Sequence, residues 1–441
     1  MVKGGSVHRG RRRAVTTATA ACIALAALLA VTGWSSSNKA LAAQTSSASS
    51  NPLGVDDGAS LTMWTRSATQ AESQLLVNAY NKSHKNKVHL TVVPTDSYQQ
   101  KVGQAAGSRQ LPDIFASDVV FSTNFATKGL WLDITGRLKA LPYGAKLAQA
   151  AIRAGTVNGK KYVVPHTIDT SVLFYNKALY RAAGLDPNKP PKTLGELAAQ
   201  ADAITKYGNG NYGTYFGGEC PGCLGFTWWP SMWADGARLI SADGKSGNFA
   251  SAKAAAVFAF YRKLVESGDS APGTSTETGA TWVSAFAKGN IGVMPMPSST
   301  LGTMPKNLQI GVAPIPGLSG GASTFVGGDV IGISSDSKHA DEAWNFIAWS
   351  LGTKAQINIL AKNHYQLART DLGSNKYTSS DPRLVAINKV LSKGQTPVAL
   401  NFGQTFNDPN GPWLKLVRDA VFGDAGKLAS DNAAISASLA G

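Results

Sequence analysis

Short apolar runs alternate with stretches of helical periodicity through most of this 441-residue chain, and that alternation constrains its fold most strongly. Residues 61–64 form a strand-like run, residues 71–82 carry apolar side chains on one helical face, and residues 88–93 form a second strand-like run. The order strand, helix, strand is typical of α/β proteins with largely parallel sheets. Further strands are expected at residues 114–115, 162–164, 172–175, 291–294, 310–313 and 330–333, and further helices at 193–204, 251–268 and 341–349.

The first 42 residues differ from the rest in charge. They hold six Lys or Arg residues and no acidic residue, whereas the whole chain has 42 basic and 27 acidic residues, which leaves a net charge of +9 beyond residue 42. Five of the six precede an apolar stretch at residues 20–31, which is shorter than the ~20 residues of a membrane span. We therefore expect a signal peptide over residues 1–42 and a flexible, Ser-rich tether over residues 43–58.

A lipid anchor is not expected after export. Residues 28–33 resemble the approach to a bacterial lipoprotein cleavage site, but Trp34 stands where the acylated Cys is required. Without a thiol at this position no thioether to a lipid can form. The expected location is therefore outside the bacterial cytoplasm, either secreted or at the cell surface.

Two glycine-rich motifs and the histidines give no support for catalysis. Residues 208–213 match a dinucleotide fingerprint but follow a helix instead of a strand, and residues 317–321 match a nucleophile elbow without a helix after it. The six His residues lack paired ligand spacing. Basic residues are spread along the chain, which argues against nucleic acid as a partner. We expect no catalytic residue, no metal and no cofactor.

Cys220 and Cys223 are the cysteine pair that would remain after export, in a Gly-rich context. A Cys-X-X-Cys pair can perform redox chemistry, but redox folds place it at the start of a helix that follows a strand. Because glycines flank this pair, we favour a structural disulfide in a loop over a redox pair.

Three tryptophans directly follow the cysteine pair. Trp233 is expected in the core, whereas at least one of the adjacent Trp228 and Trp229 is expected to be presented to a ligand. A flat aromatic face suits a sugar ring, and Asp, Glu, Asn and Arg side chains suit its hydroxyl groups.

Several segments together resemble the extracellular sugar-binding proteins of ABC importers, the group that includes maltose-binding protein. The most specific match is the run from Val164 to Lys177, in which Asp169 occupies the place of a cleft carboxylate six residues before Tyr175 and Asn176. Residues 112–118, 219–236 and 286–317 match further parts of the pattern, and Trp413 resembles an aromatic platform. Ser298 stands near the position of a second aromatic platform, so maltodextrin specificity is not implied.

The resemblance implies a periplasmic-binding-protein-like α/β fold with two discontinuous lobes around an interlobe ligand cleft. Lobe 1 is expected to span residues 59–167 and 315–350, and lobe 2 residues 168–314 and 351–441. The hinge is expected near residues 165–169, with return crossovers near residues 312–316 and 348–353.

The implied function is to bind an extracellular carbohydrate, an oligosaccharide, as a monomer and deliver it to the membrane permease of an ABC transporter. Asp118, Asp169 and Glu219 would accept hydroxyl hydrogen bonds and Arg66 would donate them. The residues expected to bind the ligand are Trp64, Arg66, Asp118, Asp169, Glu219, Trp228, Trp229, Trp282, Ser298, Asp329, Tyr365 and Trp413. The alternatives are a secreted glycoside hydrolase and a binding protein for a non-sugar solute.

Overall fold

A computed structural model describes residues 51–441. The expected signal peptide and residues 43–50 of the expected tether lie outside the described residues. No helix among residues 51–441 is both long and apolar enough to cross a membrane.

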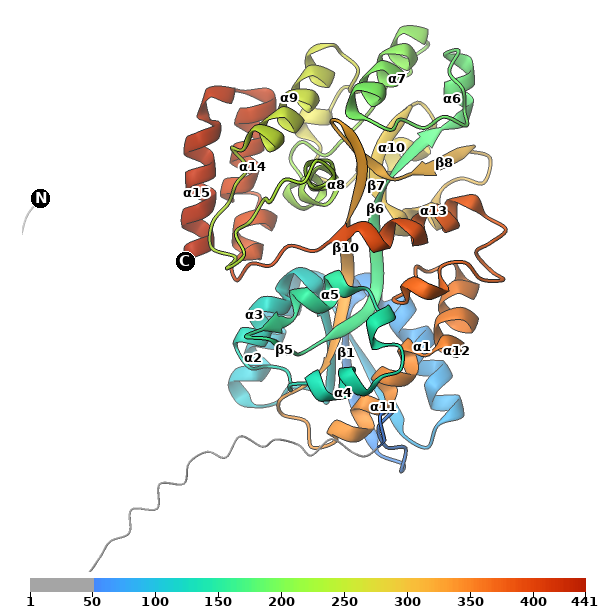
Figure 1. The fold of residues 1–441 in the computed structure, drawn as a ribbon, viewed down its shortest axis with the longest axis vertical. Helices are drawn as coiled ribbons and strands as arrows, with labels where there is room; N and C mark the ends of the chain where they lie inside the picture. The colour runs from blue at the N-terminus through green and yellow to red at the C-terminus, as the bar shows by residue number, and fades with distance from the viewer. Residues whose placement is uncertain (1–50) are drawn as a thin grey trace, which may run out of the picture. The chain divides into compact units, whose positions relative to one another are not determined.

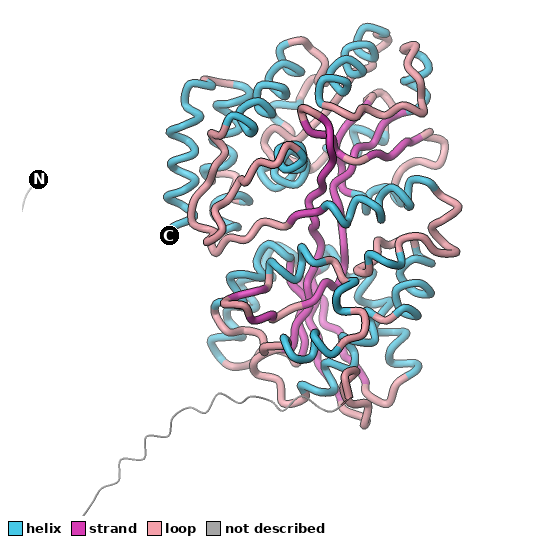
Figure 2. Tube along the Cα trace, in the orientation of Figure 1, coloured by secondary structure: helices cyan, strands magenta, loops and turns pink. Residues whose placement is uncertain are grey.

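One nine-stranded sheet connects most of the molecule, in the order β2-β1-β3-β10-β6-β7, with β8 on β6 and with β9 and β11 on β10 (Figures 1 and 2). The strands are β1 Ser60–Arg66, β2 Lys87–Val93, β3 Ile114–Asp118, β6 Val164–Asn176, β7 Val293–Pro297, β8 Ile310–Ala313, β9 Ile315–Gly317, β10 Gly320–Ile333 and β11 Gly394–Gln395; β4 Thr156–Val157 and β5 Lys160–Lys161 form a separate hairpin. Among the named strands of residues 51–441, only β1–β2, β1–β3 and β10–β11 pair in parallel. The expectation of largely parallel sheets is therefore wrong beyond β1–β3, because the long neighbours β6 and β10 run antiparallel through the centre.

Helices cover both faces of this sheet, and a helix is present at each of the four predicted ranges (Figure 1). The predicted helices at residues 71–82, 251–268 and 341–349 correspond to α1, α9 and α11. The helices are α1 Gln70–Ser83, α2 Tyr98–Ser108, α3 Ser122–Thr127, α4 Thr135–Ala140, α5 Gln149–Ala154, α6 Lys177–Ala182, α7 Leu194–Tyr207, α8 Pro221–Ala234, α9 Ala252–Glu266, α10 Trp282–Ala287, α11 Ala340–Leu351, α12 Thr353–Ala355, α13 Pro382–Val390, α14 Pro412–Val417 and α15 Leu428–Ala440. Thr193 caps α7 by accepting a hydrogen bond from the Glu196 backbone N–H, as its capping box predicts.

The described residues form two lobes whose cores are partly continuous, because one cluster contains Phe115 of the lower lobe together with Trp228 of the upper lobe. In the lobe drawn lower in Figure 1, Leu61, Leu76, Ile331 and Trp344 share one core. In the upper lobe, α8 lies in a core with α9 and α14, and Phe174 and Phe286 belong to a separate cluster. The expected two-lobe α/β architecture is confirmed.

The contacts within each lobe differ from the expected lobe boundaries at two places. Residues 351–368 were expected in lobe 2, but Leu351, Leu360 and Leu367 are buried in the core that contains Leu61. Residues 315–328 were expected in lobe 1, but β9 pairs with the first part of β10 and both pack against α8. We therefore propose lobe 1 as residues 51–168 and 329–377 and lobe 2 as residues 169–328 and 378–441.

The return crossovers between the lobes also lie at other residues than expected. β10 is a single strand of 14 residues that passes from one lobe to the other in its middle, so the chain crosses at residues 326–329 instead of 312–316. Residues 348–353 end α11 inside lobe 1.

Residues 51–58 are not a free tether. Trp344 Nε1 donates a hydrogen bond of 2.9 Å to the Pro52 carbonyl, and the Val55 N–H donates one of 3.1 Å to the Asp341 carbonyl. The Asn86 side chain also donates to the Val55 carbonyl at 2.7 Å. These bonds hold the segment against α11, which composition alone does not reveal.

Candidate functional site

The two long strands β6 and β10 lie side by side where they pass between the lobes (Figure 2). Asp169 lies on β6 at this crossing. Asp169 pairs with Gly327, where a Cβ atom would lie only 2.9 Å from Cε2 of Phe226. Gly328 has a φ of +92°, and a Cβ atom there would lie 2.3 Å from the Thr167 carbonyl oxygen. The two glycines therefore give the crossing its backbone shape and allow Phe226 to approach it.

Asp169 is held by the segment that follows β7. Its carboxylate accepts hydrogen bonds from Ser298 Oγ at 2.8 Å, from the Ser299 N–H at 3.0 Å and from Ser299 Oγ at 2.8 Å. Burial raises the pKa of Asp169 above its ordinary value of 3.8, although the bonds from Ser299 oppose this shift. Asp169 is thus a hydrogen-bond acceptor held in one position, and burial removes part of the water that would stabilise its negative charge.

A groove with two sections lies between the lobes, and its first section is on the Phe226 side of this crossing. Its cavity has a volume of about 660 Å³. Lobe 1 contributes Asp96 and Asp118, and lobe 2 contributes the first turns of α8, including the half-buried ring of Phe226. The lining also includes Asp169, Cys220, Cys223, Trp282, Phe325, Phe402, Phe406 and Asn407. This section therefore combines carboxylate acceptors with aromatic surface.

A second section lies beyond the hydrogen bond between Asp169 and Ser298, and its cavity measures about 680 Å³. Glu72 and Tyr365 line it from lobe 1, and Ser298 and Ser299 line it from lobe 2. Oε2 of Glu72 is buried without a hydrogen-bond partner. Burial raises the pKa of Glu72 well above its ordinary value, and the nearby negative charges of Asp169 and Asp329 act in the same direction. A ligand hydroxyl donor could satisfy this oxygen. We call the two sections together the groove.

Arg66 lies beside the groove and forms ion pairs with two carboxylates. Its Nη1 lies 3.2 Å from Asp118 Oδ2, and its Nε donates to Asp329 Oδ1 at 3.0 Å. Asp329 is 1% exposed and also accepts a hydrogen bond from Thr69 Oγ1. Neither Arg66 nor Asp329 lines either cavity. The expectation that Arg66 donates to a ligand conflicts with this arrangement, because its guanidinium is committed to two carboxylates.

Trp228, Trp229 and Trp413 do not face the groove, so their expected stacking role is wrong. All three are 0% exposed. The Trp228 ring stacks on Tyr261 with a centroid distance of 3.8 Å, and the Trp229 ring lies 5.5 Å from that of Trp413. For Trp228 and Trp229 the expectation assumed a loop, whereas both lie on α8, whose buried residues include every position from Thr227 to Trp233. Trp413 lies on α14, with its ring turned into the same core. Adjacent tryptophans on a helix enclosed on all sides can both be core residues, as the expected core residue Trp233 also is.

The other expected site residues divide between the groove and its surroundings. Trp282, Ser298 and Tyr365 line the groove. Trp64 lies outside both cavities, with Lys101 Nζ 4.7 Å from its ring centroid. Glu219 also lies outside them, and it accepts a 2.7 Å hydrogen bond from Arg418 Nε.

Several groove residues are absent from the sequence-based set, notably Phe226, Glu72, Asp96 and Ser299. A helical reading of residues 221–234 would have indicated Phe226, because Gly222, Gly225 and Phe226 recur at helical spacing on the face that lines the cavity. No local signal identifies Glu72, which reaches the groove only because α1 starts beside the end of β1.

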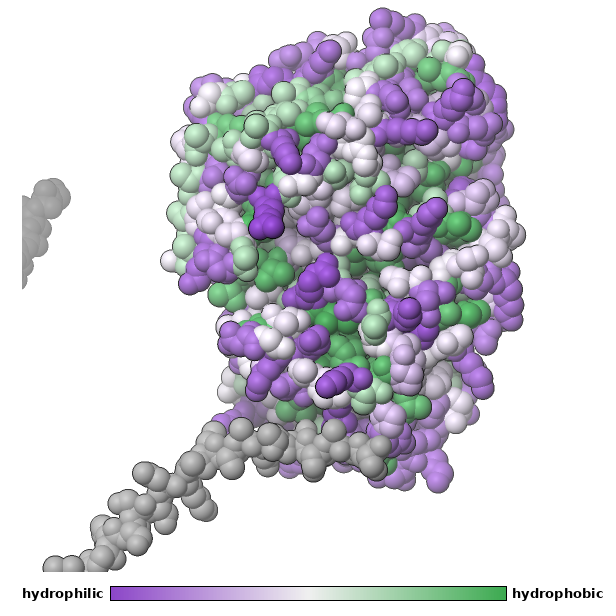
Figure 3. All heavy atoms as spheres, in the orientation of Figure 1, coloured by the Kyte–Doolittle hydropathy of each residue, from purple (hydrophilic) through white to green (hydrophobic). Residues whose placement is uncertain are grey.

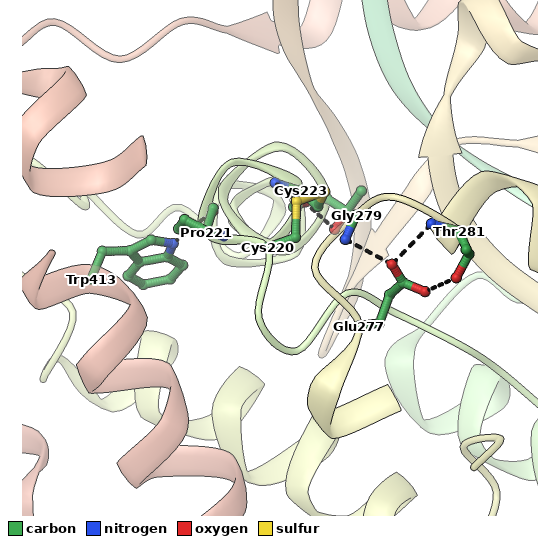
Figure 4. Close-up of a disulfide and its surroundings, with 8 residues drawn as sticks. Cys220, Pro221, Cys223, Glu277, Gly279, Thr281 and Trp413 are labelled. Atoms are coloured by element: carbon green, nitrogen blue, oxygen red, sulfur yellow. Dashed lines mark hydrogen bonds between the residues drawn. A yellow bond between two sulfur atoms is a disulfide. The ribbon is translucent and has the colours of Figure 1, made fainter. Parts of the chain in front are cut away.

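Cys220 and Cys223 form the expected disulfide, but not in a loop. Cys220 is the N-cap residue of α8, and the Cys223 N–H donates a hydrogen bond of 3.3 Å to its sulfur (Figure 4). Among residues 51–441, no group of three or more His, Cys, Asp or Glu residues is arranged to hold a metal ion.

A groove between two α/β lobes joined by long crossing strands defines a two-lobed ligand-binding protein. The sequence pattern of the family described as "Bacterial extracellular solute-binding protein" matches residues 65–357. The chain belongs to this family.

Two curated relatives illustrate the range of similarity. The chain is 24% identical over 372 residues to the diacetylchitobiose binding protein DasA of Streptomyces coelicolor, covering 80% of this chain and 83% of that protein. It is 25% identical over 264 residues to a binding protein of Brucella abortus, covering 59% of this chain and 63% of that one. The chain thus spans less than two thirds of the length of this Brucella relative.

Solved structures show the same fold at low sequence identity. The sugar-binding protein MalE of Xanthomonas citri superposes with a TM-score of 0.76 at 20% identity, covering 86% of this chain and 97% of that one. The cyclic alpha-maltosyl-1,6-maltose binding protein of Arthrobacter globiformis gives a TM-score of 0.74 at 23% identity, covering 86% and 99%.

Proposed function

We propose that the chain binds a neutral carbohydrate, an oligosaccharide, in the groove between its lobes and delivers it to the permease of an ABC transporter. The observation that carries the proposal is Asp169, a fixed carboxylate acceptor in a cavity that also presents the half-buried ring of Phe226. Sugars combine hydroxyl donors with apolar C–H faces, which match such acceptors and aromatic rings. The relatives named for diacetylchitobiose and maltose-type sugars support this ligand class.

The charges of the groove favour a neutral ligand over an anionic one. Glu72, Asp96 and Asp169 line the groove, and none of them has a Lys, Arg or His partner within 4.0 Å among the described residues. Arg66 is paired with carboxylates, and Arg383 in the second section is paired with Asp381 at 2.7 Å. The exposed Lys306 also lines the second section, so a phosphate or carboxylate on the ligand would meet uncompensated negative charge chiefly beside Asp96 and Asp169 in the first section.

Delivery would use lobe closure. Because the groove is lined from both lobes, a ligand that contacts Asp118 in lobe 1 and Phe226 in lobe 2 stabilises the arrangement that brings these residues together. The permease would recognise this closed state. We propose that the protein acts outside the cytoplasm, as a monomer without lipid or cofactor, and that it captures its ligand without chemical change.

A thermal-shift screen tests this function. Neutral mono- and oligosaccharides are compared with sugar phosphates and amino acids, each on wild-type protein and on Asp169→Asn. A ligand at about 100 times its Kd stabilises the folded state by about 2.7 kcal/mol, which corresponds to a rise of about 3 °C in Tm for a chain of this length. We expect the rise with a neutral sugar. A rise with sugar phosphates or amino acids alone would refute the proposal, and sugar cleavage during incubation would support a glycoside hydrolase instead.

A further inference from the structure

The disulfide between Cys220 and Cys223 occupies a position that favours its reduction. Cys220 caps the 14-residue helix α8, and its sulfur already accepts the N–H of Cys223. Opening the disulfide would leave Cys220 Sγ at the positive end of the helix, where backbone N–H groups stabilise a thiolate. A stabilised thiolate stabilises the reduced form and makes it the better leaving group in thiol–disulfide exchange.

The same disulfide can be reached from the groove. Both cysteines are partly exposed, and both line the cavity that contains Asp118, Asp169 and Phe226. A structural disulfide that only joins two core elements would be enclosed. This one forms part of the wall against which a ligand would lie.

A neighbouring loop rests directly on the two sulfurs (Figure 4). Gly279 has a φ of +98°, and a Cβ atom there would lie 2.7 Å from Cys220 Sγ and 3.1 Å from Cys223 Sγ. Glu277 fixes the loop by accepting the N–H groups of Gly279 at 2.8 Å and Thr281 at 3.1 Å. The loop leads into Trp282, which lines the same cavity. Two thiols need more space than a bonded pair, because unbonded atoms separate to about 3.5 Å or more. Reduction would therefore displace the loop and Trp282.

We propose that Cys220–Cys223 is a thiol–disulfide exchange site in the groove, reduced by a dithiol, and that its redox state sets ligand affinity. A thiolate of the dithiol attacks Cys223 Sγ, the bond between the two cysteines breaks, and its electron pair leaves on Cys220 Sγ. The second thiol of the dithiol then attacks the mixed disulfide and releases Cys223. The dithiol becomes a cyclic disulfide, and its two electrons and two protons pass to the protein. The affinity effect rests on the proposed function, whereas the exchange reaction does not.

The test starts with the chemistry and uses dithiothreitol as the dithiol. Folded protein is equilibrated at increasing ratios of reduced to oxidised dithiothreitol and alkylated, and Cys220 and Cys223 are quantified by peptide mass spectrometry. We expect both cysteines to become alkylated while circular dichroism stays native, because a disulfide that closes so short a loop adds little to global stability. Alkylation that requires a denaturant would overturn the proposal.

Two further readouts compare oxidised protein, reduced protein and the Cys220→Ser/Cys223→Ser variant, in which Ser keeps the N-cap of α8. We expect faster hydrogen exchange in residues 277–282 and about three- to tenfold weaker binding of the best sugar, equally in the reduced protein and in the variant. Unchanged exchange and unchanged affinity after complete reduction would overturn the coupling. If no sugar binds either state, the proposed function fails, but the alkylation and exchange results still decide the redox site.

Discussion

Phe226→Ala should weaken ligand binding and Trp228→Ala should lower the folding free energy, although only one residue separates the two positions on α8. Phe226 is half-buried and lines the groove, whereas Trp228 is 0% exposed and stacked on Tyr261. Removing a stacking ring at the centre of a binding site costs about 2 kcal/mol, or roughly a 30-fold increase in Kd. Removing a fully buried Trp costs about 3 to 5 kcal/mol of folding free energy, or about 4 to 6 °C in Tm for a chain of this length.

The assay measures both quantities for both variants. Urea denaturation gives the free energy of unfolding, and calorimetric titration with the best sugar from the screen gives Kd. Phe260→Ala is the matched control, because Phe260 is a half-buried Phe that packs on Tyr261 outside the groove. We expect Phe226→Ala to weaken binding without a large loss of stability, and Trp228→Ala to do the reverse. Loss of affinity in folded Trp228→Ala with none in Phe226→Ala would refute the placement of the groove wall.

Three further predictions concern Asp169, Glu72 and Trp344. Asp169→Asn should weaken sugar binding by about 1 to 3 kcal/mol at pH 7, and calorimetry should show wild-type affinity falling as pH drops through the raised pKa of Asp169, with no such fall in the variant. Glu72→Gln should raise the free energy of unfolding by about 1 kcal/mol at pH 7, because it removes a buried charge. This gain should shrink at lower pH, because wild-type Glu72 takes up a proton at its raised pKa. Equal gains in urea denaturation at pH 7 and pH 4 would contradict this. Trp344→Phe loses the hydrogen bond to the Pro52 carbonyl and should cost about 1 kcal/mol in urea denaturation; no loss would show that residues 51–58 are not anchored.

Some of the helices and strands could be predicted from the sequence, because local periodicity determines them. The apolar stripe of α9 and the capping box of α7 are examples, and each lies where expected. The course of β10 could not be predicted in this way. Its lobe assignment depends on pairing with β3 near one end and with β9 near the other, and those contacts are distant in sequence.

The site was harder to predict because it depends on which face of an element is covered. Asp169 was identified through a motif, and it lies at the crossing of the lobes. Trp228 and Trp229 were misassigned because glycines around Cys220 suggested a loop, whereas the segment forms a helix enclosed by core. The surface offered little help: in Figure 3 the apolar residues form small, separate patches, and only Leu53, Tyr207 and Leu400 are large exposed hydrophobic residues among those described.

The most direct test of the central claim is a crystal structure of the protein with the sugar that gives the largest thermal shift. We expect the sugar in the groove, with its hydroxyl groups on Asp118 and Asp169 and a ring face on Phe226. Electron density for the sugar outside the groove, or within it but without contact to Asp169 or Phe226, would contradict the account.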